Sequence, residues 1–371
     1  MSTHTTPLET TVSGPSAAII DHLLDELLER GGSDLLLTTG SAPFLRVDGA
    51  LRPVDGAALS DREADRLVTG VLGEELTRRF RREKQVDFAF SWGERARLRG
   101  NAFVQRGASA LALRIIPFDV PSSERLGLPP VVTGWAGLPR GFVLVTGPTG
   151  SGKSTSLAAL LDHVNTHRSV HILTIEDPIE YLHRHKRSAV NQREVGTDTD
   201  SFPAALRAAL REDPDVLLLG EMRDPESISA ALTIAETGHL VFATLHTNDA
   251  SQTLDRIVDV FPAGQQPQIR LQLAHTLVGI LNQTLIPRIG GGRVAAFEVL
   301  VGTSAIRNLI REGKTRQIRN VVSTGHRDGM HTLEAGINAL VAAGAVTYEE
   351  AVRHTAYPEE IKRPSVPVGR V

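Results

Sequence analysis

The chain has no cysteine among its 371 residues. Disulfide bonds and zinc sites built from thiolates both need this residue, so neither can form. Any structural zinc module held by several cysteines is excluded for the same reason.

The chain also has little excess of one charge over the other, and few aromatic side chains. The formal net charge is -3, and aromatic residues make up 4% of the chain. Proteins that bind nucleic acid mainly through charge carry an excess of lysine and arginine, and single-strand binders add stacking aromatics. The composition argues against a mainly electrostatic nucleic-acid or membrane binder, so we expect no nucleic-acid partner, although a local basic patch is compatible with it.

Long hydrophobic runs are missing as well. No apolar run approaches the roughly 18 residues that span a bilayer. Residues 1–17 are rich in Thr, Ser and Pro and lack the basic start and apolar centre of a signal peptide. We therefore expect a cytoplasmic protein with a disordered tail at 1–17 and a flexible tail at 362–371.

A glycine-rich turn between an apolar segment and a helix-forming segment is the most informative stretch that is present. It reads Gly147-Pro-Thr-Gly-Ser-Gly-Lys-Ser154 and follows Phe142-Val-Leu-Val-Thr146, which matches the phosphate-loop pattern in its strand, loop and helix context. Backbone N–H groups of such a loop surround phosphates, and the start of the helix adds to the anion site. The predicted ATP-binding residues are Gly147, Pro148, Thr149, Gly150, Ser151, Gly152, Lys153, Ser154 and Thr155.

Two of these residues have predicted roles of their own. Lys153 can reach the β- and γ-phosphates, and the Ser154 hydroxyl can bind Mg²⁺, a hard cation that takes oxygen ligands. The cofactors expected from the motif are therefore ATP and Mg²⁺.

The length and the order of elements predict an α/β protein with more than one compact unit. Residues 18–116 mix helical and strand patterns and form an N-terminal α+β domain, and the prolines of 117–130 indicate a linker. Strands then alternate with helices over 131–300, which predicts a parallel sheet covered on both faces. We expect the chain to be wholly helical after Gly264, with a C-terminal helical region at 301–361.

Polar residues follow several predicted core strands, where ligands of open parallel sheets bind. Glu176, Asp177 and Glu180 come after the strand at 171–175, and Glu221 comes after the strand at 216–219. Such carboxylates can activate a water or hold Mg²⁺ through its waters, so Glu221 is the expected magnesium-side group. The acidic cluster could instead be a solvated loop, but its place beside the phosphate loop favours chemistry.

Three further side chains near these strands leave alternatives open. Arg223 either serves the site or is a structural partner of Asp224 or Asp215. His239 and His246 bracket the strand at 240–245. They are either structural or, for His246 especially, able to sense the γ-phosphate. A histidine metal site is not expected, because no close pair accompanies them.

Together these segments resemble the PilT family of type IV pilus retraction ATPases, within the secretion-ATPase superfamily. The resemblance runs from about Ser33 to the C-terminal helices. Beyond the phosphate loop, it is carried by Thr174-Ile-Glu-Asp-Pro-Ile-Glu180, Asn191-Gln-Arg-Glu-Val-Gly196, Ala208-Ala-Leu-Arg-Glu-Asp-Pro-Asp-Val216, Gly220-Glu-Met-Arg-Asp224, Thr237-Gly-His239, Leu245-His-Thr-Asn248 and Ala305-Ile-Arg-Asn-Leu-Ile-Arg-Glu312. The last of these is the family's retraction signature, although alone it would indicate only a docking helix.

The resemblance implies a hexameric ring with a PAS-like N-terminal domain and a RecA-like ATPase domain, at the cytoplasmic face of the inner membrane. It implies Glu180 as the catalytic glutamate, Glu221 as the Walker B glutamate and His239 and His246 as the histidine box. The expected partners are other copies of the chain and the inner-membrane platform protein of the pilus machine.

The same resemblance implies that arginines of the N-terminal domain approach the nucleotide. Arg97, Arg99 and Arg114 occupy that strand region, and guanidinium groups can stabilise phosphoryl charge. A solvated strand face is the alternative for each of them. The chain departs from the family at Leu36, where a histidine is usual, which affects expected N-terminal contacts but not the ATPase.

The function expected from the resemblance is a hexameric motor that hydrolyses ATP to retract type IV pili. The missing cysteines separate the chain from extension and type II secretion ATPases, which generally carry a four-cysteine zinc insertion. An accessory retraction ATPase like PilU and, less favoured, a RecA-like nucleic-acid translocase are the alternatives. A regulatory subunit without turnover is disfavoured by the presence of both Glu180 and Glu221.

Overall fold

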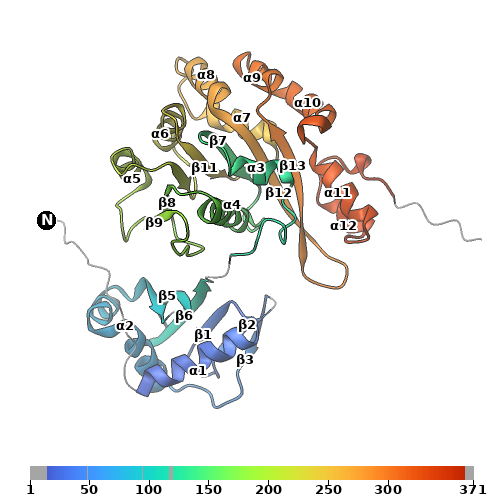
Figure 1. The fold of residues 1–371 in the computed structure, drawn as a ribbon. Helices are drawn as coiled ribbons and strands as arrows, with labels where there is room; N and C mark the ends of the chain where they lie inside the picture. The colour runs from blue at the N-terminus through green and yellow to red at the C-terminus, as the bar shows by residue number, and fades with distance from the viewer. Residues whose placement is uncertain (1–14, 48, 94, 117–119, 364–371) are drawn as a thin grey trace, which may run out of the picture. The chain divides into compact units, whose positions relative to one another are not determined.

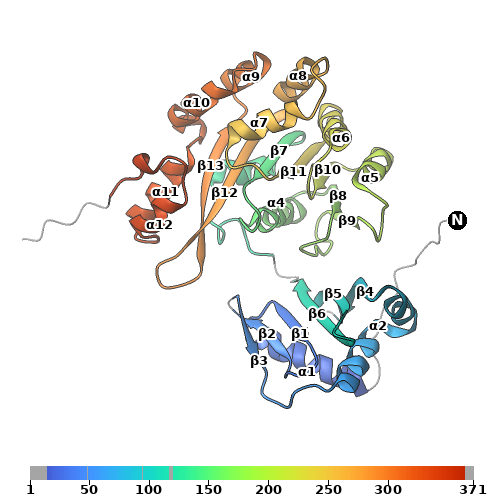
Figure 2. The same cartoon turned by 180° about the vertical axis from the view of Figure 1, so that it is seen from behind.

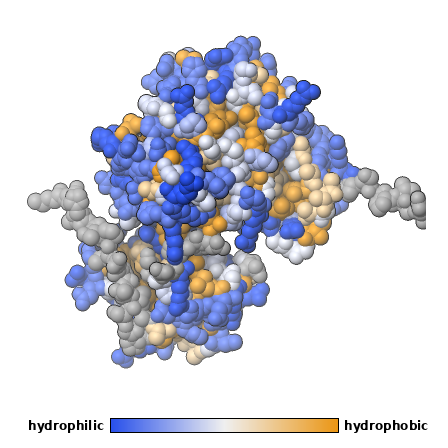
Figure 3. All heavy atoms as spheres, viewed as in Figure 1, coloured by the Kyte–Doolittle hydropathy of each residue, from blue (hydrophilic) through white to orange (hydrophobic). Residues whose placement is uncertain are grey.

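The computed structural model describes residues 15–47, 49–93, 95–116 and 120–363. The chain divides into two compact units, Met1–Asp119 and Val120–Val371. Figures 1 and 2 show the elements of each unit from opposite sides, and Figure 3 shows hydrophobic residues interspersed among hydrophilic ones on one face of each unit. No helix of the described ranges combines the length and the apolar character needed to cross a bilayer.

The N-terminal unit is a six-stranded antiparallel sheet with two helices packed on it, in the order β3-β2-β1-β6-β5-β4. Leu35 and Leu37 of the strand β1 alternate with less buried residues and face the same core as helix residues such as Leu24 and Leu67. This agrees with the predicted α+β domain. Its elements are α1 (Pro15–Glu29), β1 (Asp34–Leu37), β2 (Phe44–Val47), β3 (Ala50–Pro53), α2 (Asp61–Glu83), β4 (Gln85–Trp92), β5 (Ala96–Gln105) and β6 (Ala108–Ile116).

The C-terminal unit is built on a seven-stranded sheet in the order β13-β12-β7-β11-β10-β8-β9. All neighbouring strands run parallel except β12 and β13, which form an antiparallel hairpin at one edge. Its elements up to the hairpin are α3 (Pro130–Trp135), β7 (Gly141–Thr146), α4 (Lys153–His167), β8 (His171–Glu176), β9 (Ala189–Glu194), α5 (Phe202–Ala209), β10 (Val216–Leu219), α6 (Pro225–Glu236), β11 (Leu240–Leu245), α7 (Ala250–Asp259), α8 (Gln266–Thr276), β12 (Leu277–Pro287) and β13 (Arg293–Val301).

Helices cover both faces of this sheet, as predicted. Successive side chains of a strand point to opposite faces. In β7, Phe142 and Leu144 pack with α5, α6 and α8, whereas Val143 and Val145 pack with α3 and α4. A strand with apolar residues on both faces is typical of a parallel sheet. The PAS-like domain followed by a RecA-like domain with C-terminal helices is therefore the fold class of the chain.

The prediction that the chain is wholly helical after Gly264 is wrong. Helix α8 ends at Thr276, and residues 277–301 form the hairpin of β12 and β13. The reason is that β12 is buried on both faces, so apolar residues do not alternate with polar ones along it, and periodicity cannot separate such a strand from a buried helix. Helix α7 and strand β9 are further elements absent from the prediction.

Three domain boundaries also differ from the prediction. Helix α1 begins at Pro15, inside the segment predicted as a tail, because proline is well suited to the first turn of a helix. Residues 120–130 belong to the second unit rather than a linker, since Leu128 packs in its core. Lys362 donates its N–H to Asn338 Oδ1 at 2.7 Å, so it is held to the C-terminal helices. The guanidinium of Arg363 lies 5.2 Å from the centre of the Tyr348 ring, and residues 1–14 and 364–371 of the predicted tails lie outside the described ranges.

The C-terminal helices follow the hairpin. They are α9 (Ser304–Arg311), η1 (Thr315–Gln317), α10 (Ile318–Thr324), η2 (His326–Asp328), α11 (Leu333–Ala342), α12 (Tyr348–Arg353) and η3 (Pro358–Glu360). Helix α11 packs on the outer strand β13 of the hairpin, whereas α9 packs against α8 and α10 against α7 and α9. Gly336 of α11 lies so close to β13 that a Cβ there would be 2.7 Å from the Phe297 carbonyl oxygen. Helix α11 therefore rests directly on the strand backbone at this point.

Candidate nucleotide-binding and hydrolysis site

The candidate residues come together because they follow the carboxyl ends of neighbouring parallel strands. The phosphate loop follows β7, His246 follows β11, Glu221 comes two residues after β10, and Glu180 lies four residues after β8. These strands are adjacent in the sheet in that order. The predicted groups are thus supplied by different loops at the carboxyl ends of neighbouring strands.

Two glycines of the phosphate loop are required by the close approach of the hairpin. Gly147 has φ +137°, and a Cβ there would lie 2.3 Å from the Gln283 carbonyl oxygen. Gly152 has φ +88° and precedes the first residue of α4. Larger residues would both strain these backbone conformations and collide with β12.

Lys153 is folded over the phosphate loop. Its Nζ donates to the carbonyl oxygens of Gly147 at 2.9 Å and Pro148 at 3.0 Å, and it lies 3.3 Å from His246 Nδ1. Burial lowers the pKa of Lys153, and the nearby charge of Glu221 works in the opposite direction. The ammonium is thus held where the loop would meet a phosphate.

Glu221 links His246 and Arg223. One carboxylate oxygen lies 3.2 Å from His246 Nε2, and the other accepts from the Arg223 guanidinium at 2.6 Å. Burial acts to raise the pKa of Glu221, but the Arg223 hydrogen bond and the charges of His246 and Arg223 outweigh it and lower the pKa. Lys153 can only donate and an ionised carboxylate can only accept, so the geometry assigns the proton of a neutral His246 to Nε2.

The partner of Arg223 differs from both expected structural partners. Asp224 caps helix α6 by accepting the Ser227 N–H, and Asp215 accepts the His171 N–H. Arg223 instead pairs with Glu221, a residue two positions away. Both aspartates are occupied by backbone donors, which satisfy them locally.

The acidic cluster after β8 contains groups in two different environments. Glu176 is buried, and burial raises its pKa, although hydrogen bonds from Thr174 and Gln192 oppose the shift. Glu180 is exposed, and the next residue, Tyr181, places its hydroxyl 3.0 Å from Thr155 Oγ1 at the start of α4. Glu180 therefore lies in a segment that touches the phosphate-loop helix, with its carboxylate open to a ligand or water.

His239 and His246 do not form one cluster. They stand at opposite ends of β11, which separates them by roughly 20 Å at the usual rise per residue. His239 Nδ1 lies 2.9 Å from the Ile234 carbonyl oxygen and fastens the end of α6. His246 contacts Lys153 and Glu221, so it alone of the pair belongs to the site described here.

The hairpin contributes residues that the sequence did not reveal as part of the site. Gln283 donates to the Ser151 carbonyl oxygen and accepts from Ser156 Oγ at 2.8 Å. It therefore bonds both the phosphate loop and the first turn of the helix α4 that follows it. Asn282 donates to Thr146 Oγ1 at 3.0 Å and to the Thr247 carbonyl oxygen at 2.9 Å. The available signal was an Asn-Gln pair within an apolar segment, which has no evident purpose in a core helix.

Arg97, Arg99 and Arg114 belong to the N-terminal unit, on β5 and β6. Arg99 and Arg114 are paired across these strands, and Arg114 donates to Asp34 at 2.8 Å. Arg97 is partly buried, and its Nε has no hydrogen-bond partner among the described residues. Their approach to a nucleotide stays a prediction.

The oxygen donors of the site suit Mg²⁺ better than a metal that needs a cage of protein ligands. The Ser154 side chain is exposed at the start of α4, and Glu221 provides a carboxylate with a low pKa. Within the described ranges no three histidine, aspartate or glutamate side chains are grouped as a metal cage. Mg²⁺ usually takes one or two protein oxygens and completes its shell with phosphate and water. Ser154 and Glu221 fit that pattern.

The sheet order, the phosphate loop and the carboxylates on the adjacent strand ends define the class of phosphate-loop ATPases. The family model of type II/IV secretion system proteins matches residues 11–290. The type IV pilus retraction ATPase PilT of Pseudomonas aeruginosa is 48% identical over 92% of this chain and 99% of its own length. PilU of the same organism, a type IV pilus ATPase, is 40% identical over 92% of this chain and 90% of its own length.

Solved structures agree with the sequence relatives. The crystal structure of the pilus retraction motor PilT with bound ADP superposes with a TM-score of 0.86 at 47% identity, and the match covers 91% of this chain and 97% of that one. The chain belongs to the type II/IV secretion ATPase family and, within it, to the PilT family.

Proposed function

We propose that the protein is an ATP-hydrolysing hexameric motor that retracts type IV pili. The observation that carries the proposal is the match to PilT along nearly the whole of both chains. It is supported by the phosphate loop, Glu221 and Glu180, which follow neighbouring strands of the sheet. The identity to PilU is lower, which favours the main retraction motor over an accessory one.

In this proposal the phosphate loop and Lys153 hold the β- and γ-phosphates of ATP. Ser154 and Glu221 would hold Mg²⁺, directly or through its waters, and the ion would neutralise charge on the phosphates. Glu180, exposed beside the phosphate-loop helix, takes a proton from the attacking water, and its accessible carboxylate suits that role. The products are ADP and inorganic phosphate.

His246 reports the state of the γ-phosphate in the same proposal. Its Nδ1 lies 3.3 Å from Lys153 Nζ, and its Nε2 lies 3.2 Å from Glu221. When phosphate draws the ammonium away from the loop carbonyls, the His246 contacts change with it. Arg97, Arg99 and Arg114 would supply positive charge from the N-terminal unit, directly or across a subunit boundary.

The proposed assembly is a homohexamer at the cytoplasmic face of the inner membrane, where it engages the platform protein of the pilus machine. It reaches the membrane through that partner.

Deletion of the gene with live imaging of labelled pili tests the proposal. We expect pili that extend but no longer retract, restored by the wild-type gene and not by Glu180→Ala. Normal retraction in the deletion strain, or loss of the fibres themselves, would contradict the motor assignment. Retraction that persists at reduced force would favour the accessory role.

Phosphate release from the purified protein with ATP and Mg²⁺ is the matching biochemical test. We expect turnover that requires the divalent ion and is not raised by DNA. Turnover that depends on DNA and falls steeply with salt would favour the nucleic-acid translocase. An absence of phosphate release in every assembly state would remove the proposal.

A further inference from the structure

Two buried polar residues of the β12–β13 hairpin are direct neighbours. Asn282 of β12 and Glu298 of β13 are opposite each other in the strand register, and both are almost fully buried. Side chains of such a pair point to the same face, with Cβ atoms about 5 Å apart. We call these two residues the hairpin clamp.

Both residues of the hairpin clamp hold the segment that follows β11. Asn282 donates to the Thr247 carbonyl oxygen at 2.9 Å. Glu298 accepts the Ala250 N–H at 2.9 Å, where α7 begins. Because these contacts lie one and four residues after His246, they fix the short connection that carries this histidine.

Asn282 also reaches the other side of the site. Its amide donates to Thr146 Oγ1 at 3.0 Å, and Thr146 is the residue immediately before the phosphate loop. One side chain thus joins the end of β7 to the loop after β11. The relative position of the phosphate loop and His246 depends on it.

The unpaired Asn282 Oδ1 indicates the protonation state in which the Glu298 carboxyl group fits this pair. Asn282 Oδ1 is buried and has no hydrogen-bond partner among the described residues, although Glu298 is its cross-strand neighbour. A neutral carboxyl group carries an O–H that could donate to this oxygen, whereas an ionised one cannot. A buried acceptor left unpaired is costly, so the neutral form satisfies the pair better.

The charges around Glu298 come from three elements. The pKa of Glu298 is raised to about 7, chiefly by burial, with smaller contributions from the charges of Asp249 before α7 and Glu334 of α11. The Ala250 N–H and the charge of Arg319 of α10 oppose this rise. The balance favours the neutral acid below about pH 7.

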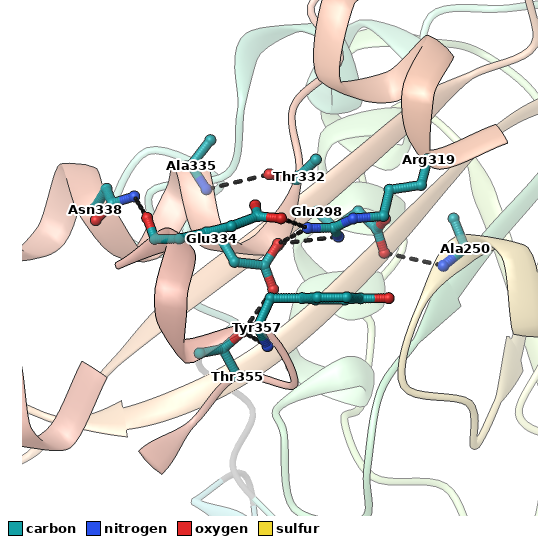
Figure 4. A network of polar contacts seen from close by, with 10 residues as sticks. Ala250, Glu298, Arg319, Thr332, Glu334, Ala335, Asn338, Thr355 and Tyr357 are labelled. Carbon is teal, nitrogen blue, oxygen red and sulfur yellow. Dashed lines mark hydrogen bonds and ion pairs between the residues drawn. The ribbon is translucent and has the colours of Figure 1, made fainter. Parts of the chain in front are cut away.

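The C-terminal helices enclose the hairpin clamp. Arg319 donates to Glu334 at 3.1 Å and to Glu360 at 2.7 Å, and its guanidinium lies 3.8 Å from the centre of the Tyr357 ring. Figure 4 shows this network beside Glu298 and the Ala250 N–H. The groups that set the charge of Glu298 are therefore held by helices remote in sequence from the phosphate loop.

We propose that Asn282 and Glu298 are positioning residues for ATP hydrolysis: they hold the β11–α7 connection so that His246 stays over the phosphate loop, with Glu298 acting as a neutral acid. This inference rests on the proposed ATPase function. Neither residue is placed in contact with Lys153 or Glu221, so their effect passes through the connection that carries His246 and, for Asn282, also through Thr146 before the phosphate loop.

The test compares Glu298→Ala and Glu298→Gln with wild type in the full-length protein. Glutamine keeps an acceptor for the Ala250 N–H and imitates the neutral acid. Alanine removes the acceptor and leaves the N–H unpaired. The control is Glu350→Ala, which removes a partly buried glutamate whose partners are Arg353 on the same helix and His354 directly after it.

The measurements are kcat and KM for ATP from pH 6 to 8.5, and the affinity for a fluorescent ATP analogue. For Glu298→Ala we expect kcat to fall about tenfold, as one misplaced polar contact would cause, with nucleotide affinity changed less than about twofold. Glu298→Gln and Glu350→Ala should turn over like wild type at pH 6. Wild type should lose turnover as Glu298 ionises, and Glu298→Gln should lack this loss.

Several outcomes would overturn the inference. Wild-type kcat in Glu298→Ala, or a ten-fold loss in Glu298→Gln at pH 6, would remove the positioning role. If Glu298→Ala does not fold, the pH profiles of wild type and Glu298→Gln decide, and identical profiles would reject the neutral-acid role. A wild-type protein that releases no phosphate would instead refute the proposed function.

Discussion

The loops after the core strands and the β12–β13 hairpin contribute to the same site in different ways. Glu180 is exposed and the Glu221 side chain is 20% exposed, whereas Asn282 and Gln283 are 0% and 1% exposed. Groups that meet a ligand lie at open strand ends, where little packing constrains them. Groups that position the site are buried in the sheet and make contacts with backbone atoms of the loops.

Removal of Glu180 tests the exposed groups at the strand ends, and it has the largest expected effect on ATP turnover. We expect Glu180→Ala to lower ATP turnover roughly 100- to 10,000-fold, as loss of a general base does, while nucleotide binding is kept. Phosphate release and analogue binding measure the two effects. Glu226→Ala, an exposed glutamate paired with Arg207, serves as the control. Normal turnover in Glu180→Ala would exclude it as the base.

Lys153 belongs to both regions, because it is buried and yet is proposed to bind the phosphates. Lys153→Ala removes a charged donor, so we expect nucleotide affinity to fall roughly 10- to 100-fold. Lys186→Ala removes an ammonium that pairs with Asp162 of α4 from a loop outside the helix, and it should bind like wild type. Unchanged affinity in Lys153→Ala by equilibrium titration would contradict the assigned phosphate contact.

Gln283 tests the buried side of the comparison. Gln283→Ala leaves the Ser151 carbonyl oxygen and the Ser156 hydroxyl without this partner, and we expect nucleotide affinity to fall about tenfold because the phosphate loop is less well held. The same change at Gln272, which bonds Glu236 at the surface, should be neutral. Equal effects at the two positions would show that the hairpin does not support the loop.

Glu298 gives the smallest expected effect, on stability and its pH dependence. Its pKa is about 7 in the folded protein against an ordinary 4.5, so the folded state binds the extra proton and is destabilised as pH rises between these values. We expect the Tm of wild type to fall by a few degrees more than that of Glu298→Gln from pH 5 to pH 8. Parallel Tm profiles from calorimetry would contradict the raised pKa.

The exposed residues of the site could be predicted from the sequence, because each of them closely follows a strand that is recognisable from its own local sequence. Ligands bind beyond the carboxyl ends of parallel strands, so residues just after each apolar segment were candidates. The structure brings Lys153, Glu221 and His246 into contact and places Glu180 next to the phosphate-loop helix. The order of the strands in the sheet, which decides these neighbours, was not specified by any local pattern.

The buried side could not be predicted, for a physical reason. Residues 277–281 and 285–286 are apolar apart from Gly279, and the polar residues 282–284 between them give no clear period of two. Pairing with β7 makes the segment a strand. Because the strand was not predicted, the position of Asn282 and Gln283 beside the phosphate loop could not be predicted either. The role of Glu298 could not be predicted either, because it depends on the cross-strand pair with Asn282 and on the charge of Arg319 from a later helix.

The contact of Gly336 with the Phe297 backbone has a mechanical consequence. No side chain separates α11 from β13 there, so the joint contains no compressible layer. A load applied to the C-terminal helices at this joint would press on the residue beside Glu298 rather than be absorbed by rearranging side chains. The helix and the strand would then move as one lever arm.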